Sequence, residues 1–354
     1  MADKIPTISG FKASHNLDIN VPDEILRQFP ALIPLFKNQE IKNEFTEPET
    51  SANLYKFLFN FTGLTSLIFI IIVLLFTIWR YSALSAGFQV QNYFVWVSAI
   101  LGILSLIVSI ASYFLRFQYH WLYSRFTLER LRQFMFQQLL DGNFIELATT
   151  NKEQFDLALT ERWHKFKFDF VLKKGAMNSF TKAADFKLFV NPNLSGNSEL
   201  SQQIFEAYFV LRLGYQEEYF SFKQEELIDL DEWTKSLAKI SLLIAGVLAL
   251  AELIILLIHN SMLEKQVGWI IGALAVSSAL VSGGVRVFRN ARAISEEAER
   301  YISKWVVLKI LSERFSGQNS TPEKRLEVMI ETERVCIEEL REFIRAFNKS
   351  DYLL

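Results

Sequence analysis

The chain has few of the residues that build disulfide, metal or catalytic sites. It contains one cysteine, Cys336, and four histidines, His15, His120, His164 and His259, among 354 residues. A single cysteine excludes an intramolecular disulfide and fits a reducing compartment. The histidines lack a zinc-binding spacing such as HExxH. We therefore expect no metal site and no cofactor.

The chain also has no large excess of positive or negative charge. The formal net charge is −2, so the chain has no overall field that would attract nucleic acid or an anionic substrate. The sequence shows no phosphate-binding glycine loop, no paired carboxylates in an apolar pocket, and no serine or cysteine nucleophile spaced to meet a histidine. These absences predict a protein that is not an enzyme, has no catalytic residues and binds no nucleic acid.

Long apolar runs are what the chain has instead. An α-helix needs about twenty apolar residues to cross ~30 Å of hydrocarbon. Two pairs of such runs, each pair joined by a short linker, flank a long middle segment. They are Phe57 to Trp79, Phe94 to Leu115, Ile240 to Ile258, and Val267 to Val285. The sequence therefore predicts an integral membrane protein with four transmembrane helices in two hairpins.

Basic residues predict the orientation of these helices. The two hairpin linkers hold only Arg80 and Lys265, whereas the middle segment is rich in lysine and arginine, and Arg286, Arg289 and Arg292 follow the fourth run. Basic residues remain on the cytoplasmic side of a membrane. The N-terminus lacks the basic and apolar regions of a cleavable signal. We expect a multi-pass protein of the inner membrane with both termini and the middle segment in the cytoplasm.

These patterns predict an all-α membrane protein with helical cytoplasmic stalks and a helical insert. The expected segments follow the four runs along the chain. They are a cytoplasmic N-terminal segment (1–55), hairpin 1 (56–116), a cytoplasmic helical insert (117–236), hairpin 2 (237–287) and cytoplasmic C-terminal helices (288–354).

Apolar residues at helical spacing extend the prediction beyond the membrane. Residues 23–36 predict a short helix, interrupted by prolines and lying near the membrane surface; a disordered tail is the alternative. The second run should continue as a helical stalk until the Asp141-Gly142-Asn143 cluster, and a similar stalk from Glu199 to about Lys235 should lead into the third run. Between the stalks we expect short helices at best.

The last helix, predicted to begin at Thr321-Pro322, carries apolar residues at alternating steps of four and three. The seam consists of Leu326, Ile330, Glu333, Ile337, Leu340, Ile344 and Phe347. Such spacing is typical of a coiled coil, but it equally suits a helix that packs against other helices of the same chain.

Glu252 is the one charged residue inside the four runs. A carboxylate there costs roughly 2.5 kcal/mol or more on insertion scales, and such residues usually face a bundle interior or water. Glu252 is therefore a candidate pore-lining or gating residue. Alternatively, it lies near the outer interface, or it pairs with Lys265 across the linker.

The fourth run is rich in small residues. Small residues four apart let a second helix backbone approach closely. The predicted packing stripe consists of Gly268, Gly272, Ala275, Ala279 and Gly283. The partner is either the third run of the same chain or a helix of another chain.

Two segments outside the runs share a pattern of aromatic, arginine and acidic or amide residues. HWLYSRFTLERLR follows hairpin 1, and YFVLRLGYQEEYFSFK precedes hairpin 2. Both are similar to signatures of bacterial SLATT-type proteins and related two- and four-helix membrane effectors. The residues that carry the resemblance are His120, Trp121, Arg125, Glu129, Arg130, Leu131, Arg132, Tyr208, Arg212, Gln216, Tyr219 and Lys223.

The resemblance implies a membrane effector of a prokaryotic conflict or antiviral system. Such a protein would oligomerise and form a pore or perturb the inner membrane when a sensor or a nucleotide second messenger triggers it. The chain departs from the simplest pattern by its second hairpin and by the long insert 117–236, and it shows no recognisable nucleotide-sensing domain.

The residues themselves allow two explanations of these segments. Because Tyr208, Arg212 and Gln216 share one helix face and Arg125 can bridge Glu129, the segments fit a structural scaffold between stalks. A surface for a ligand or partner, built from these residues with Trp121, Arg132 and Tyr219, is the other explanation. At the level of function, the alternative to a pore is a membrane scaffold whose cytoplasmic helices dock a partner protein.

Overall fold

The computed structural model describes residues 19, 21–87, 93–171, 175–183, 186–257 and 267–349. His15, His259 and Lys265 lie outside these residues. The described chain is 88% helical and contains no strand; its one isolated β-bridge joins Asp141 to Asn193. The predicted all-α class is confirmed.

The chain divides into two compact units. The core unit contains the described residues of Met1–Asn53, Trp121–Glu226 and Glu297–Ala346. The hairpin unit contains those of Leu54–His120, Leu227–Glu296 and Phe347–Leu354.

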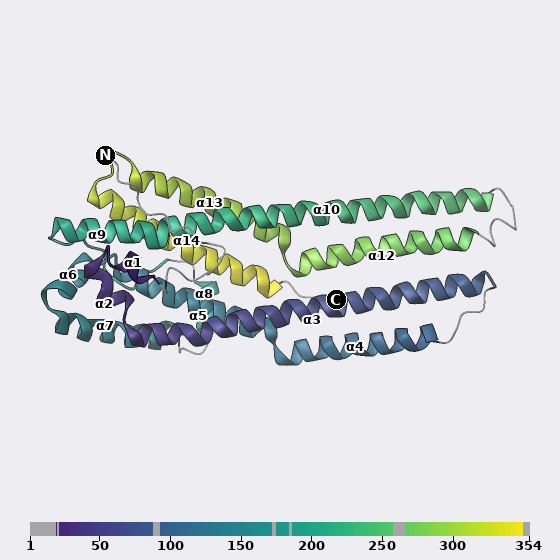
Figure 1. The fold of residues 1–354 in the computed structure, drawn as a ribbon, viewed down its shortest axis with the longest axis horizontal. Helices are drawn as coiled ribbons and strands as arrows, with labels where there is room; N and C mark the ends of the chain where they lie inside the picture. The colour runs from purple at the N-terminus through teal and green to yellow at the C-terminus, as the bar shows by residue number, and fades with distance from the viewer. Residues whose placement is uncertain are drawn as a thin grey trace. The chain divides into compact units, whose positions relative to one another are not determined.

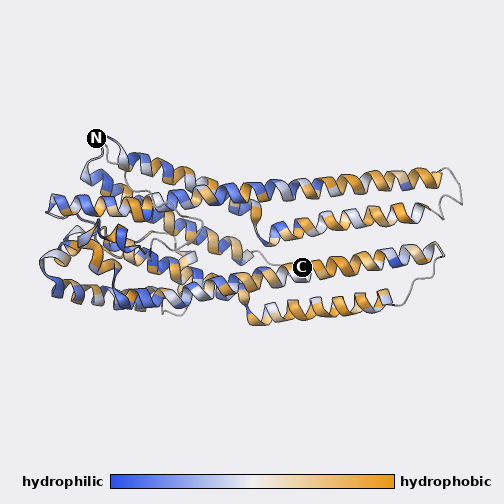
Figure 2. Cartoon of the chain, in the orientation of Figure 1, coloured by the Kyte–Doolittle hydropathy of each residue, from blue (hydrophilic) through white to orange (hydrophobic). Residues whose placement is uncertain are grey.

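The hairpin unit contains the four predicted runs as helices long and apolar enough to cross a membrane. α3 (Gln39–Ser85) and α4 (Tyr93–Leu115) form the first hairpin, and α10 (Gly214–Leu257) and α12 (Trp269–Ala291) form the second (Figure 1). Apolar residues concentrate along α4 and along the C-terminal halves of α3 and α10 (Figure 2). The chain is a multi-pass membrane protein.

The second helix of each hairpin ends at a backbone break. Arg116 (φ 49°) separates α4 from α5 (Phe117–Gln138), and Ala293 (φ 48°) precedes α13 (Ile294–Ser316). The predicted helical stalk after the second run is therefore present as α5, which ends just before the Asp141-Gly142-Asn143 cluster. Arg116 interrupts the path from α4 into this stalk, because a residue in the left-handed region cannot continue a right-handed helix. Before the third run the stalk is helical throughout, from α9 (Ser198–Tyr208) through the π-turn η3 (Phe209–Leu213) into α10.

The core unit is built from short N-terminal turns and from helices on both sides of the hairpins in sequence. Its further elements are α1 (Asp23–Leu26), η1 (Pro30–Leu32), α2 (Ile33–Phe36), α6 (Gly142–Thr150), α7 (Lys152–Phe166), the π-turn η2 (Lys167–Val171), α8 (Ala176–Lys182) and α14 (Pro322–Lys349). At 15 residues, α7 is longer than the short helices expected between the stalks.

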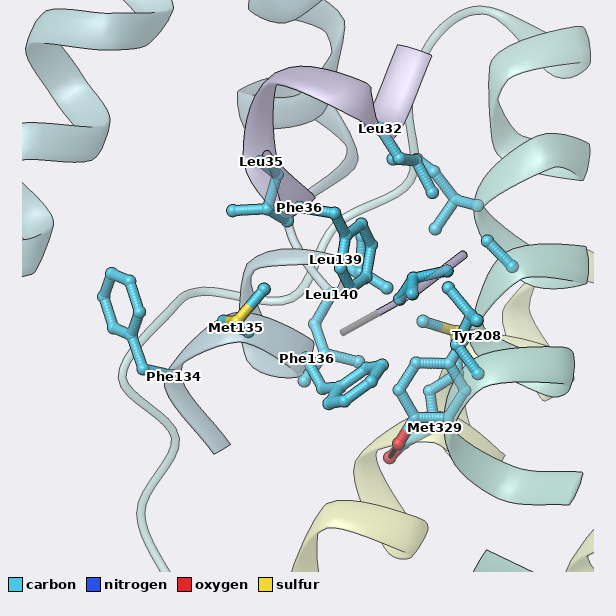
Figure 3. Close-up of a cluster of buried hydrophobic side chains, with 14 of the residues drawn as sticks. Leu32, Leu35, Phe36, Phe134, Met135, Phe136, Leu139, Leu140, Tyr208 and Met329 are labelled. Atoms are coloured by element: carbon cyan, nitrogen blue, oxygen red, sulfur yellow. Dashed lines mark hydrogen bonds between the residues drawn. The ribbon is translucent and has the colours of Figure 1, made fainter. Parts of the chain in front are cut away.

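Residues 23–36 form the predicted interrupted helix, but they lie inside the core unit. Leu32 and Phe36 are fully buried, and the ring of Phe36 contacts that of Phe136 with centroids 5.9 Å apart (Figure 3). The apolar side chains of this segment fill the protein core and are therefore not available to insert into lipid.

The coiled-coil seam of α14 is also buried within the chain. Glu333, Ile337, Leu340 and Ile344 are each no more than 2% exposed. The structure therefore agrees with packing against the chain's own helices, and these positions are not free for an intermolecular coil.

Candidate functional site

Three segments of the core unit converge on one buried polar cluster. The end of α9, η3 and the start of α10 carry Tyr208, Arg212, Gln216 and Tyr219; α5 carries Trp121, Arg125, Glu129 and Arg132; α14 contributes Glu333, Cys336 and Glu339. The two motif segments therefore meet around the C-terminal helix.

The π-turn η3 positions Arg212. A Cβ atom at Gly214 would lie 3.0 Å from the carbonyl oxygen of Phe209, so a residue without a side chain permits the widened turn. Single π-turns inside α-helices are frequent at functional sites. At the start of α9, Asn197 caps the helix by accepting hydrogen bonds from the backbone N–H groups of Glu199 and Leu200.

Arg212 and Glu333 form the centre of the cluster. Arg212 Nε donates to Glu333 Oε1 at 3.0 Å, and the Tyr208 hydroxyl lies 3.0 Å from the same oxygen and 3.1 Å from the Met329 carbonyl oxygen. The Arg212 guanidinium also lies over the ring of Phe136, 4.9 Å from its centroid. Figure 3 shows Tyr208 beside Phe136, close to Met329.

This centre keeps unused hydrogen-bonding capacity. Within the described chain, Arg212 Nη1 and Nη2 and Glu333 Oε2 are buried without a hydrogen-bond partner. Burial raises the pKa of Tyr208 well above its usual value, and the neighbouring Glu333 raises it further. The hydroxyl therefore stays protonated and can donate to the carboxylate.

Glu129 is the second acid of the cluster. Arg125 Nη2 lies 2.8 Å from its Oε1, and Arg132 Nη1 donates to the same oxygen. Burial opposes ionisation, but the charges of Arg125, Arg132 and Arg212 outweigh it and hold the pKa of Glu129 below its usual value. Glu129 is therefore an ionised acid held among arginines.

A small cavity opens beside these acids. Its walls include Arg125 and Glu129 from α5, Gln216 and Tyr219 from α10, and Cys336 and Glu339 from α14. The cavity is just large enough for one water molecule and is too small for a nucleotide. Burial raises the pKa of Cys336 to about 12, so its thiol is neutral and a poor nucleophile.

The structure brings most of the predicted stalk residues together. Trp121 packs edge-on against Phe343 of α14, with ring centroids 5.6 Å apart. Sequence reasoning missed Glu333, Cys336 and Glu339 as members of the cluster. The signal for Glu333 was its place as an acid in an otherwise apolar seam.

In the hairpin unit, Glu252 lies against α12. A Cβ atom at Gly272 would lie 2.5 Å from Glu252 Oε1, so the missing side chain at Gly272 makes the space that the carboxylate occupies. Glu252 is half-buried and has no hydrogen bond or ion pair within the described chain. The predicted partner Lys265 lies outside the described residues.

The predicted small-residue stripe of α12 is only partly used. Gly268 and Ala275 are buried and Gly272 contacts Glu252, whereas Ala279 and Gly283 are exposed. For these two residues packing stays a prediction, because a helix of another chain is one of the two partners that the sequence allows.

Helix α12 packs on two sides. Ser282 donates to the carbonyl oxygen of Ala238 on α10 at 2.8 Å, whereas Gly284 lies against Ile71 of α3. Residues two apart on a helix point to nearly opposite sides, so α12 lies between a helix of its own hairpin and a helix of the other. Trp79 of α3 supports this contact by donating to Ser277 Oγ at 3.2 Å.

Comparisons of the chain with protein-family models, curated proteins and solved structures gave no match. The two motif segments and the geometry around Arg212 and Glu252 therefore carry the functional inference.

Proposed function

We propose that this protein is a SLATT-like membrane effector of a prokaryotic conflict or antiviral system. It resides in the inner membrane with both termini and the insert in the cytoplasm, and it oligomerises to permeabilise the membrane when a sensor or a second messenger triggers it. The two motif segments and the basic residues that flank the hairpins support this assignment.

The observation that carries the pore is the environment of Glu252. Its carboxylate is half-buried, without an ion pair in the described chain, and it lies against a glycine near the start of α12. An unpaired carboxylate is costly in an apolar span, and such groups mark ion pathways or contacts with partners. In an oligomer, several copies would supply a ring of carboxylates that favours cations.

The buried cluster of the core unit favours a second candidate, the scaffold. Arg125 and Glu129 pair within α5, Tyr208 and Arg212 bond to α14, and the adjoining cavity has room for one water. A second messenger would need a rearranged cluster or another surface. In the scaffold alternative, the cluster fixes the shape of the insert and the insert docks a partner protein.

Ion flux separates the two candidates. Purified protein in liposomes under a KCl gradient is measured with and without a candidate trigger. The triggered protein should conduct, with the reversal potential of a cation-selective path. Glu252→Gln should reduce cation preference without lowering the amount of folded protein. Glu232→Gln is the matched control, because Glu232 is an exposed residue of the same helix.

Each result has a consequence. If Glu252→Gln conducts with the selectivity of the parent, Glu252 does not line the path. If liposomes that contain the parent protein leak no more than protein-free liposomes, with and without a candidate trigger, the scaffold is the better assignment.

A further inference from the structure

The two hairpins match one another element by element. Each has a long first helix, α3 or α10, and a second helix of 23 residues, α4 or α12. Each second helix ends near a residue with φ close to 50°, Arg116 or Ala293, and a further helix begins at the next residue. Figure 1 shows the two long–short pairs.

The same side-chain hydrogen bonds recur at matching positions on the long helices. Thr62 Oγ1 donates to the carbonyl oxygen of Leu58 at 2.7 Å, and Thr234 Oγ1 donates to that of Leu230 at 2.8 Å. Both threonines also reach the carbonyl oxygen three residues earlier, at 3.3 and 3.1 Å.

Matching bonds also join the two helices of each hairpin. Ser105 Oγ donates to the carbonyl oxygen of Ser66 at 3.1 Å, and Ser282 Oγ donates to that of Ala238 at 2.8 Å. Ser66 and Ala238 each lie four residues after the matched threonine, since 66 − 62 = 4 and 238 − 234 = 4. The positive-φ residue follows the serine by eleven residues in both, since 116 − 105 = 11 and 293 − 282 = 11. The hairpins are structural repeats.

The repeat places two opposite charges at one depth. Arg80 follows Thr62 by eighteen residues and Glu252 follows Thr234 by eighteen, since 80 − 62 = 18 and 252 − 234 = 18. Eighteen residues of α-helix rise about 27 Å, so both side chains lie near the far end of the span. Neither has an ion pair within the described chain.

The packing between the hairpins keeps these two charges apart. Trp79, the residue before Arg80, contacts α12 through Ser277 and through the ring of Trp269, 6.2 Å away. Successive helical residues point about 100° apart, so Arg80 does not share the face of α3 that contacts α12. Glu252, by contrast, lies at the seam of α10 with α12.

We propose that Arg80 of one copy pairs with Glu252 of a neighbouring copy, so that the partner of this surface is a second copy of the chain. Charges in membranes are retained where they pair with one another. A contact between different surfaces of successive copies uses both charges of every copy and can close into a ring. The inference rests on the oligomer of the proposed function and gives Glu252 a different role in it. A carboxylate paired with Arg80 joins two copies and does not contribute a free charge to a cation path.

Charge reversal in two separately tagged chains tests the pair. Arg80→Glu alone and Glu252→Arg alone should each shift the particle mass in lipid nanodiscs from oligomer to monomer. Co-expression of the two variants should restore an oligomer that holds both tags, because each junction again joins an arginine to a glutamate. Glu232→Arg, on the exposed part of α10, should leave the mass of the oligomer unchanged.

The outcomes that overturn the proposal are distinct. A parent that stays monomeric with and without a candidate trigger, or single variants that assemble like the parent, excludes the contact. Assembly restored only when one chain carries both reversals places the pair within a copy. Ion flux by the parent is measured separately. If the parent conducts but charge reversal does not change assembly, the Arg80–Glu252 contact is excluded and the proposed function still stands.

Discussion

Arg212 and Glu333, 121 residues apart in sequence, form an ion pair of 3.0 Å between Nε and Oε1, with side chains 1% and 0% exposed. The pair joins the π-turn before hairpin 2 to the C-terminal helix α14. A buried pair is weak evidence of net stability, but removal of one partner leaves an uncompensated charge. Substitution of either residue should therefore destabilise the core unit.

Glu333→Gln should destabilise the core unit by about 3–5 kcal/mol, because Arg212 would stay buried without its counter-charge. Thermal unfolding of purified protein, followed by circular dichroism, measures the loss. Glu338→Gln, on the exposed side of the same helix, is the control and should unfold like the parent. Equal melting temperatures for the parent and both variants would show that the cluster does not stabilise the core unit. That result would favour the explanation of the cluster as a surface for a ligand.

Asp231, outside the membrane runs, should give hairpin 2 an acid-sensitive contact. Burial opposes its charge, but bonds from Lys235, Ser295 and Arg289 lower its pKa to about 2. The stabilisation is complete above the usual aspartate pKa, about 3.9, and is lost as pH falls toward 2. The stability difference between the parent and Asp231→Asn should therefore be constant near neutral pH and shrink in acid. A constant difference down to pH ~2 would contradict the lowered pKa.

Gly272→Ala should displace the carboxylate of Glu252, because the new Cβ would lie 2.5 Å from Oε1. We expect a loss of about 1 kcal/mol in detergent stability. The loss should disappear when Glu252 is also alanine, which a double-mutant cycle measures. Gly283→Ala is the matched control, since nothing lies within 4 Å of its Cβ position. If the two stability losses are additive in the cycle, Gly272 and Glu252 do not interact.

Gly142→Ala should destabilise the core unit by about 1–3 kcal/mol through overpacking. Its Cβ would meet the backbone of Leu194, 2.9 Å from the carbonyl carbon, and the backbone nitrogen of Ser195. Gly196→Ala, in the same loop and with open space around the Cβ position, should have little effect. Chemical denaturation compares the two variants; a larger loss at position 196 would contradict the close approach of this loop to the start of α6.

Cysteine labelling tests the orientation. In a Cys336→Ala background, Ser85→Cys should react with a membrane-impermeant maleimide added outside spheroplasts, because the basic residues hold the opposite ends of the hairpins in the cytoplasm. Ser195→Cys should react only after the membrane is opened. Labelling of position 195 from outside would contradict the predicted orientation.

The sequence by itself determined the four membrane helices, because hydrophobic insertion depends on about twenty consecutive residues. It also determined that Glu252 is the one charge within the runs, and it marked the two motif segments. These properties are local. The sequence could not place residues 23–36, since an apolar helical face fits a protein core as well as a membrane surface.

The tertiary structure alone decided which distant residues meet. Glu333 became the partner of Arg212, and the small residues of α12 divided between two neighbouring helices. Periodicity gives the face on which a residue lies but not the helix that packs against it. The breaks at Arg116 and Ala293 were equally hidden, because neither residue type marks a left-handed backbone. Long-range packing, which no single segment encodes, fixed these features.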